Sequence, residues 1–211
     1  GEEHVVADVA DLDAMADASR GADSVVHMAG ISGESTWPAI SRANIEGTYA
    51  TLEAARRAGI GRVVLASSNH ATGYTPRPGA GLLREADAPP RPDTYYGVAK
   101  VTMEALGSLY VDRYGMDVVC LRIGSAFAEP TTTRHLSTWL SPDDTVSLVH
   151  AALTAPAPGF SVVWGVSANT RAWWDLAAAR ALGYEPQDGA EVYAAALVEA
   201  HGEPDLADPV H

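Results

Sequence analysis

The sequence alternates short runs of apolar, mostly β-branched residues with longer segments of helical periodicity. The apolar runs lie at residues 24–28, 62–66, 117–123 and 160–165, and segments whose apolar residues recur at near-helical spacing separate them. Parallel strands joined by helical crossovers have this arrangement. The pattern predicts an α/β fold, and a length of 211 residues favours one main domain.

Capping residues and glycines mark where the helices begin and end. Asp11 is expected to cap a short helix, and Ser141 followed by Pro142 and two acidic residues is a strong helix start. Gly59 and Gly115 are expected to end two longer helices. Helices are therefore predicted over residues 12–19, 39–58, 95–114, from 142 onward, 173–181 and 191–200, with a surface excursion at 75–92 and loop at 204–211.

The beginning of the sequence lacks a feature that parallel nucleotide-binding sheets share. A dinucleotide-binding unit opens with a glycine-rich turn, because only glycine lets backbone N–H groups approach the pyrophosphate. Residues 30–33 (Gly-Ile-Ser-Gly) follow a strand, but they lack a third glycine and a helix directly behind them. We therefore expect a sheet without its first two strands, in which residues 5–7 form the end of the third.

Charge and cysteine content exclude several kinds of partner. Fourteen basic against 27 acidic residues give a formal charge of -13, which repels nucleic acid and anionic lipid, so neither partner is expected. An anionic small ligand would need a locally placed cation. The single cysteine, Cys120, lies in an apolar run and is expected to be a buried, inert thiol. With no leader segment and no apolar run of about 20 residues, a cytoplasmic location is expected.

Tyr96 and Lys100 stand one helical turn apart and share a face of the predicted helix. A tyrosine with a pKa of about 10 is a poor base, but a neighbouring cation favours the phenolate and lowers that pKa. The pair taken alone is weak evidence, because Tyr and Lys meet at this spacing by chance in many helices.

A polar cluster, residues 67–70 (Ser-Ser-Asn-His), follows the predicted strand at 62–66. Open parallel sheets bind ligands beyond the carboxyl ends of their strands, so a hydroxyl here is positioned to hold a reacting oxygen. Ordinary capping of a strand end by Ser and Asn explains the same residues if nothing else matches.

The cluster and the Tyr96/Lys100 pair together, in this order, resemble the Ser–Tyr–Lys site of the extended short-chain dehydrogenases. Within that branch, which includes the NAD-dependent epimerases and dehydratases, the chain most resembles the uronate dehydrogenases, from about Val5 to the last residues. The resemblance is carried by Asp8-Val9, His27 to Gly30, Asn44 to Thr48, Ser67 to His70, Tyr96 to Lys100, Leu121 to Ser125, Arg134 to Ser141, Val163 to Asn169 and Trp173 to Asp175.

The resemblance implies a Rossmann-type doubly wound parallel sheet and a redox reaction with NAD. The anomeric carbon of a hexuronate, such as galacturonate or glucuronate, would be oxidised to an aldarolactone. Tyr96 would remove the hydroxyl proton while Ser68 holds that oxygen, and Lys100 would lower the Tyr96 pKa and bind the nicotinamide ribose. The resemblance places Ser32, Asn69, His70, Ser125 and Arg134 on the sugar, and Asp8, Val9, Ala29, Gly30, Ile31, Tyr96 and Lys100 on the cofactor.

Arg134 suits a carboxylate clamp, since a planar guanidinium takes a carboxylate with two parallel hydrogen bonds. Its alternative is a surface ion pair with Glu129 or Asp144. Trp173 and Trp174 are expected to be core or interface packing. A homo-oligomer is expected and a metal site is not. Within the single domain, about 1–125 would form the cofactor side and about 126–211 a small substrate side of helices and one strand.

Two other functions remain open at this level. A sugar-nucleotide epimerase or dehydratase uses the same Ser/Tyr/Lys chemistry, although roughly 85 residues after Ser125 are few for housing a nucleotide diphosphate. A non-catalytic remnant that binds a partner is the other alternative, and the absent glycine-rich turn is its main support. Without that turn we expect weaker NAD binding, which bears on the activity of this chain by itself.

Overall fold

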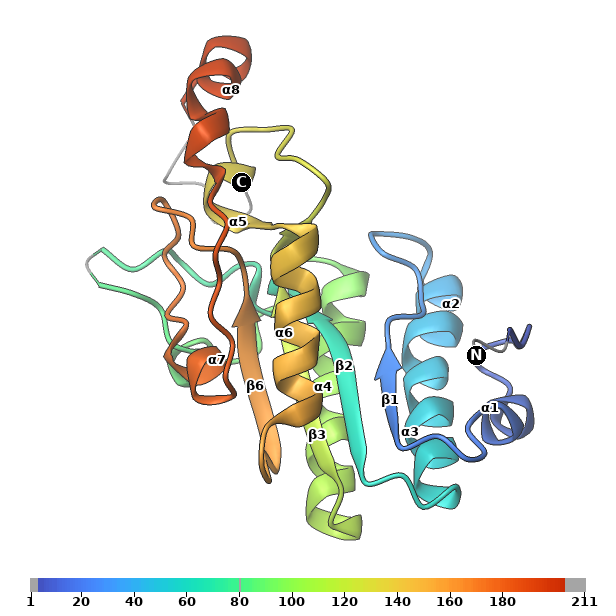
Figure 1. Cartoon of the computed structure of the whole chain (residues 1–211). Coiled ribbons are helices and arrows are strands. Elements are labelled where there is room, and N and C mark those ends of the chain that lie inside the picture. Colours follow the sequence, from blue (N-terminus) through green and yellow to red (C-terminus); the bar gives the residue numbers. More distant parts are fainter. Residues whose placement is uncertain (1–3, 80, 204–211) are drawn as a thin grey trace.

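The computed structural model describes residues 4–79 and 81–203 and shows an α/β fold built on one main parallel sheet (Figure 1). Its strands are β1 (Ser24–His27), β2 (Arg62–Ser68), β3 (Asp117–Ile123) and β6 (Phe160–Gly165), hydrogen-bonded in the order β1-β2-β3-β6. All three pairings are parallel, so the carboxyl ends of the strands meet at one edge. The predicted Rossmann-type sheet is confirmed, and the strand at 62–66 continues through Ser68.

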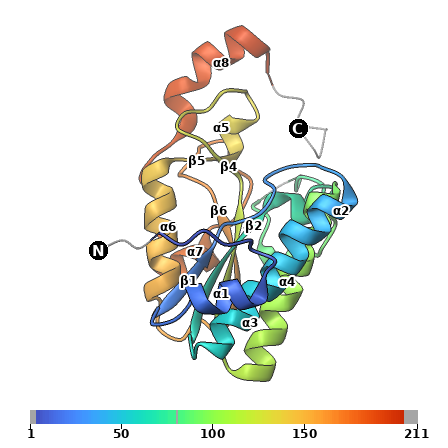
Figure 2. The same ribbon diagram turned by 90° about the vertical axis from the view of Figure 1, so that its right-hand side faces the viewer.

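Helices cover both faces of this sheet, as the edge-on view shows (Figure 2). α3 (Gly47–Arg57) and α4 (Tyr95–Tyr114) pack on one face, and α6 (Pro142–Thr154) and α7 (Ala177–Ala181) on the other. Alternate residues of a strand point to opposite faces. Val63 and Leu65 of β2 accordingly enter the core beneath α3 and α4, whereas Val64 enters the core beneath α6.

The predicted capping residues form the expected contacts. The Asp11 carboxylate accepts from two amides at the start of α1 (Leu12–Ala18), a helix that packs against α3. Gly115, with a φ of +67°, ends α4 as predicted, and the Thr94 hydroxyl, which was not among the predicted caps, accepts from the Gly97 amide at the start of that helix. Ser141 caps α6, with Pro142 in its first turn. The predicted bounds of α4, β3 and β6 are confirmed.

The helix predicted over residues 39–58 is interrupted by a wider turn. It consists of α2 (Trp37–Ile40), the π-helical segment η1 (Ser41–Glu46) and α3. Asn44, in η1, is buried, and its amide accepts from the Ile31 N–H and donates to the Ile31 carbonyl, both at 2.9 Å. The π turn thus carries a side chain that holds the loop after β1.

Residues 5–7 do not form the predicted strand end. Val5 and Val6 are exposed, and this segment runs without regular structure into α1. A strand requires a hydrogen-bonded neighbour, and within residues 4–79 and 81–203 the sheet has no strand beside the free edge of β1. The β-branched residues of this segment are therefore not sufficient to form a strand without a pairing partner.

Two further predictions need correction. The excursion at 75–92 contains the 3₁₀ turn η3 (Glu85–Asp87) and is partly buried, because Leu83 exchanges backbone hydrogen bonds with Trp173 and Asp175 and lies in the core with Trp164 and Trp174. The pairing keeps Trp173 and Trp174 extended, so the helix predicted from 173 begins only at α7. Trp174 is core packing, as expected, and it stacks on Trp164.

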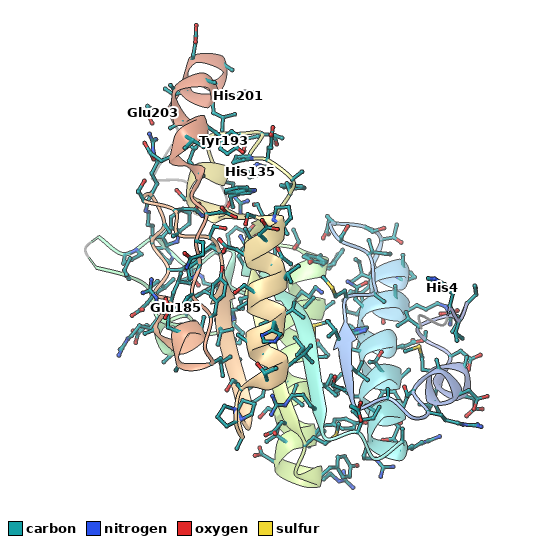
Figure 3. The ribbon with its side chains drawn as sticks, in the orientation of Figure 1. His4, His135, Glu185, Tyr193, His201 and Glu203 are labelled. Atoms are coloured by element: carbon teal, nitrogen blue, oxygen red, sulfur yellow. The ribbon has the colours of Figure 1, made fainter. Side chains whose placement is uncertain are left out.

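The remaining elements lie beyond the carboxyl edge of the sheet. They are the 3₁₀ turn η2 (Asn69–Thr72), the two-stranded β4 (Ser125–Ala126) and β5 (Trp139–Leu140), α5 (His135–Thr138), the 3₁₀ turn η4 (Ala190–Tyr193) and α8 (Ala194–His201). Figure 3 shows His135 and Tyr193 above the end of α6. The helix predicted over residues 191–200 is therefore present, beginning as the 3₁₀ turn η4 and continuing as α8. Residues 204–211, predicted as loop, lie outside the described residues.

One composition-based expectation has a structural counterpart. Cys120 is fully buried, and burial raises the pKa of its thiol, as expected of an inert cysteine. Among the helices of residues 4–79 and 81–203, none combines the length and the apolar character that crossing a bilayer demands.

Candidate functional site

A cavity of about 360 Å³ opens at the carboxyl edge of the main sheet. The loops after β1, β2 and β3 and the first two turns of α4 form its walls, so it lies where open parallel sheets bind ligands. Nine of the residues predicted for the site line it: Ala29, Gly30, Ile31, Ser32, Ser68, His70, Tyr96, Lys100 and Ser125. Met28, Ile123 and Phe127 also line it and were not predicted as site residues.

Ser68, Tyr96 and Lys100 face the same cavity from two elements. Ser68 is the last residue of β2 and caps η2 by accepting from the His70 amide, whereas Tyr96 and Lys100 occupy the first two turns of α4. Gly97 brings α4 against η2, because a Cβ on Gly97 would lie 2.3 Å from the His70 carbonyl oxygen. The close approach of strand end and helix depends on this glycine.

The electrostatics of the pair differ from the expectation for Lys100. Burial raises the pKa of Tyr96, and only the Ser68 hydroxyl acts in the opposite direction. Burial also lowers the pKa of Lys100 to about 8. The ammonium donates to the Ala66 carbonyl at 2.5 Å and lies 5.2 Å from the centre of the Tyr96 ring. It is thus held by the strand end, and no lowering of the Tyr96 pKa by Lys100 is found.

His70 is held by an aspartate that the sequence analysis did not single out. Its Nδ1 lies 2.9 Å from both carboxylate oxygens of Asp93, and its ring meets the Tyr96 ring edge-on with centroids 5.6 Å apart. Asp93 immediately precedes Thr94, the residue that caps α4. No motif in the sequence reveals this pair, since its members are 23 residues apart.

Ser125 and Arg134 meet at the far wall. Arg134 donates to the Ser125 hydroxyl at 3.4 Å, and that hydroxyl is paired with Thr138 at 2.9 Å. Arg134 has no ion pair with Glu129 or Asp144 among the ion pairs of the described residues, so its surface alternative is not realised there. Burial lowers the pKa of Arg134, and the charge of Asp93 opposes that shift.

Four predicted residues lie outside the cavity wall. The Asn69 amide is buried and accepts from the Ser68 hydroxyl at 3.3 Å, so it reaches the cavity only through Ser68. Asp8 is exposed and pairs with Arg42, and Val9 packs against Gly47 at the start of α3. Arg134, the fourth residue not on the wall, touches it through Ser125.

Glu34 joins the loop after β1 to α4, a link that was not predicted. Its carboxylate accepts from the Tyr96 amide at 3.2 Å. An anionic group at a helix N-terminus satisfies a free N–H and complements the helix dipole. The loop that contributes Ile31 and Ser32 to the cavity is therefore tied at one end to Asn44 and at the other to α4.

The size and lining of the cavity suit a small ligand. Its volume of about 360 Å³ is of the size of small-ligand pockets, and apolar Met28, Ile31 and Ile123 alternate on its wall with a few polar groups. At Gly30, with a φ of +136°, a Cβ would lie 3.1 Å from the Asn44 side chain. Only glycine fits this turn comfortably, and the backbone itself forms that part of the wall.

Comparison with known proteins supports the same reading. The model of the NAD dependent epimerase/dehydratase family matches residues 2–173. A uronate dehydrogenase from Pseudomonas syringae pv. tomato is 44% identical over 99% of this chain and 74% of its own length. The crystal structure of a glucuronic acid dehydrogenase from Chromohalobacter salexigens is 41% identical, with a TM-score of 0.91, over 99% of this chain and 79% of its own.

A further solved structure contains a cofactor. It is a mutant uronate dehydrogenase from Agrobacterium tumefaciens complexed with NAD, 44% identical to this chain with a TM-score of 0.90, over 97% of this chain and 76% of its own. The resemblance identified from the motifs is confirmed. The chain belongs to the NAD dependent epimerase/dehydratase family, and within it to the uronate dehydrogenases.

Proposed function

We propose that the protein oxidises the anomeric carbon of a hexuronate, such as galacturonate or glucuronate, to an aldarolactone, with NAD as the hydride acceptor. The observation that carries this proposal is the meeting of Ser68, Tyr96 and Lys100 in one cavity, with Arg134 bound to Ser125 on its wall. A sugar-nucleotide epimerase is not favoured, because relatives 41–44% identical to the chain are uronate or glucuronic acid dehydrogenases.

Tyr96 is proposed as the base and Ser68 as the group that holds the reacting oxygen. The buried phenol has a raised pKa, so the phenolate needs a cation close to the oxygen. Lys100 is one turn away and supplies that cation when its ammonium leaves the Ala66 carbonyl for the site. Bound NAD would accept the hydride. Asp8, Val9, Ala29, Gly30, Ile31, Tyr96 and Lys100 are the residues proposed to hold the cofactor.

The sugar is proposed to lie between the loops after β1, β2 and β3. Arg134 would take the carboxylate as a bidentate partner, and this local cation offsets the repulsion from a chain of formal charge -13. Ser125 orients Arg134, while Ser32 and His70 face the cavity. Asn69 would act on the sugar side through the Ser68 hydroxyl that it accepts from.

The proposal extends to the organisation of the chain. Residues 1–125 are proposed as the cofactor side and residues 126–211 as the substrate side. Arg134 from the second part binds Ser125 at the end of the first, which supports a site assembled from both.

A cytoplasmic homo-oligomer is proposed. The reduced, buried Cys120 fits that compartment, and the exposed Trp37 and Tyr95 rings, 5.6 Å apart, offer apolar surface to a second copy.

The test follows the absorbance of reduced nicotinamide when the protein is mixed with NAD and galacturonate or glucuronate. Turnover of at least one uronate is expected. Tyr96→Phe should lower kcat by roughly 100-fold or more, because general base catalysis contributes at least that much. Tyr95→Phe is the matched control: its ring is half exposed and packs on Trp37, so turnover should persist. Absence of turnover with both uronates contradicts the proposal.

A second arm tests the substrate class. Arg134→Met should lower kcat/KM for galacturonate by roughly tenfold to 100-fold, since a hydrogen bond between charged groups contributes about 1.5–3 kcal/mol. Activity toward the neutral sugar galactose, which lacks the carboxylate, should change little. If both substrates lose the same factor, Arg134 is not the carboxylate clamp. If a sugar nucleotide but no uronate protects the protein from thermal unfolding, the epimerase alternative replaces this proposal.

A further inference from the structure

Asp93 lies close to three parts of the site that are separate in the sequence: the start of α4, His70 in η2, and Arg134. It follows the excursion at 75–92 and precedes the cap of α4, the helix that carries Tyr96. Both of its carboxylate oxygens lie 2.9 Å from Nδ1 of His70 in η2. Its charge also acts on the half-buried Arg134. A single carboxylate therefore borders two residues proposed to contact the sugar.

Burial, hydrogen bonds and steric contacts restrict the Asp93 carboxylate to one position. Its side chain is only 4% exposed. Oδ1 also accepts from the Thr94 hydroxyl at 3.0 Å, and Oδ2 occupies the space of a side chain at Gly73, where a Cβ would lie 2.0 Å away. The partner of His70 is thus buried, hydrogen-bonded and sterically confined, whereas His70 itself remains one-third exposed toward the cavity.

We propose that Asp93 is a positioning residue that fixes His70 in the tautomer protonated at Nδ1 and so presents Nε2 to the cavity as a hydrogen-bond acceptor for a sugar hydroxyl. A carboxylate only accepts hydrogen bonds, so the nitrogen beside it carries the proton. In a neutral imidazole the other nitrogen is then unprotonated. The substrate part of this inference rests on the proposed function; the tautomer part does not.

The contact between His70 and Tyr96 explains how the orientation of His70 would help to position the sugar. The His70 and Tyr96 rings are inclined at 74° with centroids 5.6 Å apart and both line the cavity, so one ligand can reach both side chains. An acceptor at Nε2 orients a sugar hydroxyl with its hydrogen toward His70. That arrangement fixes the sugar relative to Tyr96 without His70 taking part in proton transfer.

The first measurement is the ¹⁵N NMR spectrum of the histidine rings at a pH where they are neutral, with the His70 signals assigned by their loss in His70→Gln. We expect the Nδ1-protonated pattern in the unaltered protein. In Asp93→Asn the amide oxygen stays with Thr94 and the NH₂ group faces His70 as a donor, so the pattern should change to protonation at Nε2. A wild-type spectrum with Nε2 protonated overturns the inference without any variant.

Kinetics separate positioning from a purely structural role. Asp93→Asn should raise KM for the uronate roughly tenfold, the value of one hydrogen bond, and change kcat by less than about threefold. Asp87→Asn is the matched control, since Asp87 is exposed and pairs only with Arg84 among the described residues. An unchanged KM overturns the inference. If no uronate is turned over, the proposed function fails, while the NMR spectra still decide the tautomer.

Discussion

Lys100 is the single lysine among the fourteen basic residues of the chain, and it is buried where its charge is unfavourable. An arginine stays charged at any physiological pH, whereas a lysine loses its proton when burial lowers its pKa. The Lys100 pKa of about 8 lets both forms exist near neutral pH. The choice of lysine here, in a chain that otherwise uses arginine, points to chemistry and not to packing.

Replacing Lys100 should therefore stabilise the protein while inactivating it. The pKa is about 8 in the folded state and about 10.4 in an unfolded chain, so the unfolded state binds more protons between these values and stability rises with pH there. Below pH 8 the full cost of the buried charge applies. Lys100→Met removes it and should raise the free energy of unfolding at neutral pH by on the order of 1–3 kcal/mol, less the lost bond to Ala66.

Urea unfolding over a pH series checks this expectation, and the gain should shrink as the pH rises above about 8. A gain that is independent of pH, or a loss at neutral pH, contradicts it. Because the chain has one lysine, reductive methylation with ¹³C-formaldehyde labels only Lys100 and the terminal amine. The NMR titration of that label reads the pKa directly.

At the scale of elements, local signals predicted most of the fold. The end of α4 follows from Gly115, and the bounds of β3 and β6 follow from apolar runs between turns. The failures lie where a distant partner decides. Residues 5–7 have strand propensity but no neighbouring strand among the described residues, and residues 173–175 stay extended because Leu83 pairs with them. The π turn contains Asn44, whose partner, Ile31, lies in the loop after β1.

The packing of α4 against η2 should be sensitive to one methyl group. Gly97→Ala places a Cβ 2.3 Å from the His70 carbonyl oxygen, so the helix has to move away from the strand end that carries Ser68. Stability should fall by roughly 1–3 kcal/mol, the usual cost of overpacking, and kcat should fall as Tyr96 separates from Ser68. Thermal unfolding and turnover of a uronate measure the two effects.

Gly107→Ala provides the comparison within the same helix. It gains the same helix propensity, about 1 kcal/mol, but its Cβ would meet the Val118 side chain at 3.0 Å and not a backbone atom. Its position is also three turns from Tyr96. If both variants lose kcat equally, the close contact at Gly97 is not what positions the site.

At the scale of the whole molecule, the sequence order of the main site residues was predictable, but the contacts between residues distant in the sequence were not. Ser68, Tyr96 and Lys100 were visible because strand end and helix follow one another in the sequence. Asp93 and Glu34 were not identified, and the contact made by Asn44 was not predicted, since each acts through a partner that only folding brings near. The cavity wall after β3 was missed for the same reason, apart from Ser125.

A buried ion pair between Arg122 and Glu104 joins several of the elements that form the site. Arg122 of β3 binds Glu104 of α4 through two hydrogen bonds of 2.9 Å, and their side chains are 5% and 8% exposed. The Ser67 hydroxyl, beside Ser68, donates to the same carboxylate at 2.7 Å. Arg122 also donates to the Ala88 carbonyl, which ties the 75–92 excursion to the sheet. The ion pair thus contacts α4, β2, β3 and the 75–92 excursion.

Removing one partner should be worse than removing both. Arg122→Met leaves the Glu104 carboxylate buried and unpaired, which should lower the free energy of unfolding by about 3–5 kcal/mol, whereas adding Glu104→Met should recover most of the loss. Turnover should not recover, because Ser67 and the excursion lose their shared anchor next to Ser68 and Asp93. Denaturant unfolding and uronate turnover of the single and double variants separate these effects. If turnover returned with stability, the pair would serve the fold alone, and the position of the strand end would depend on apolar packing.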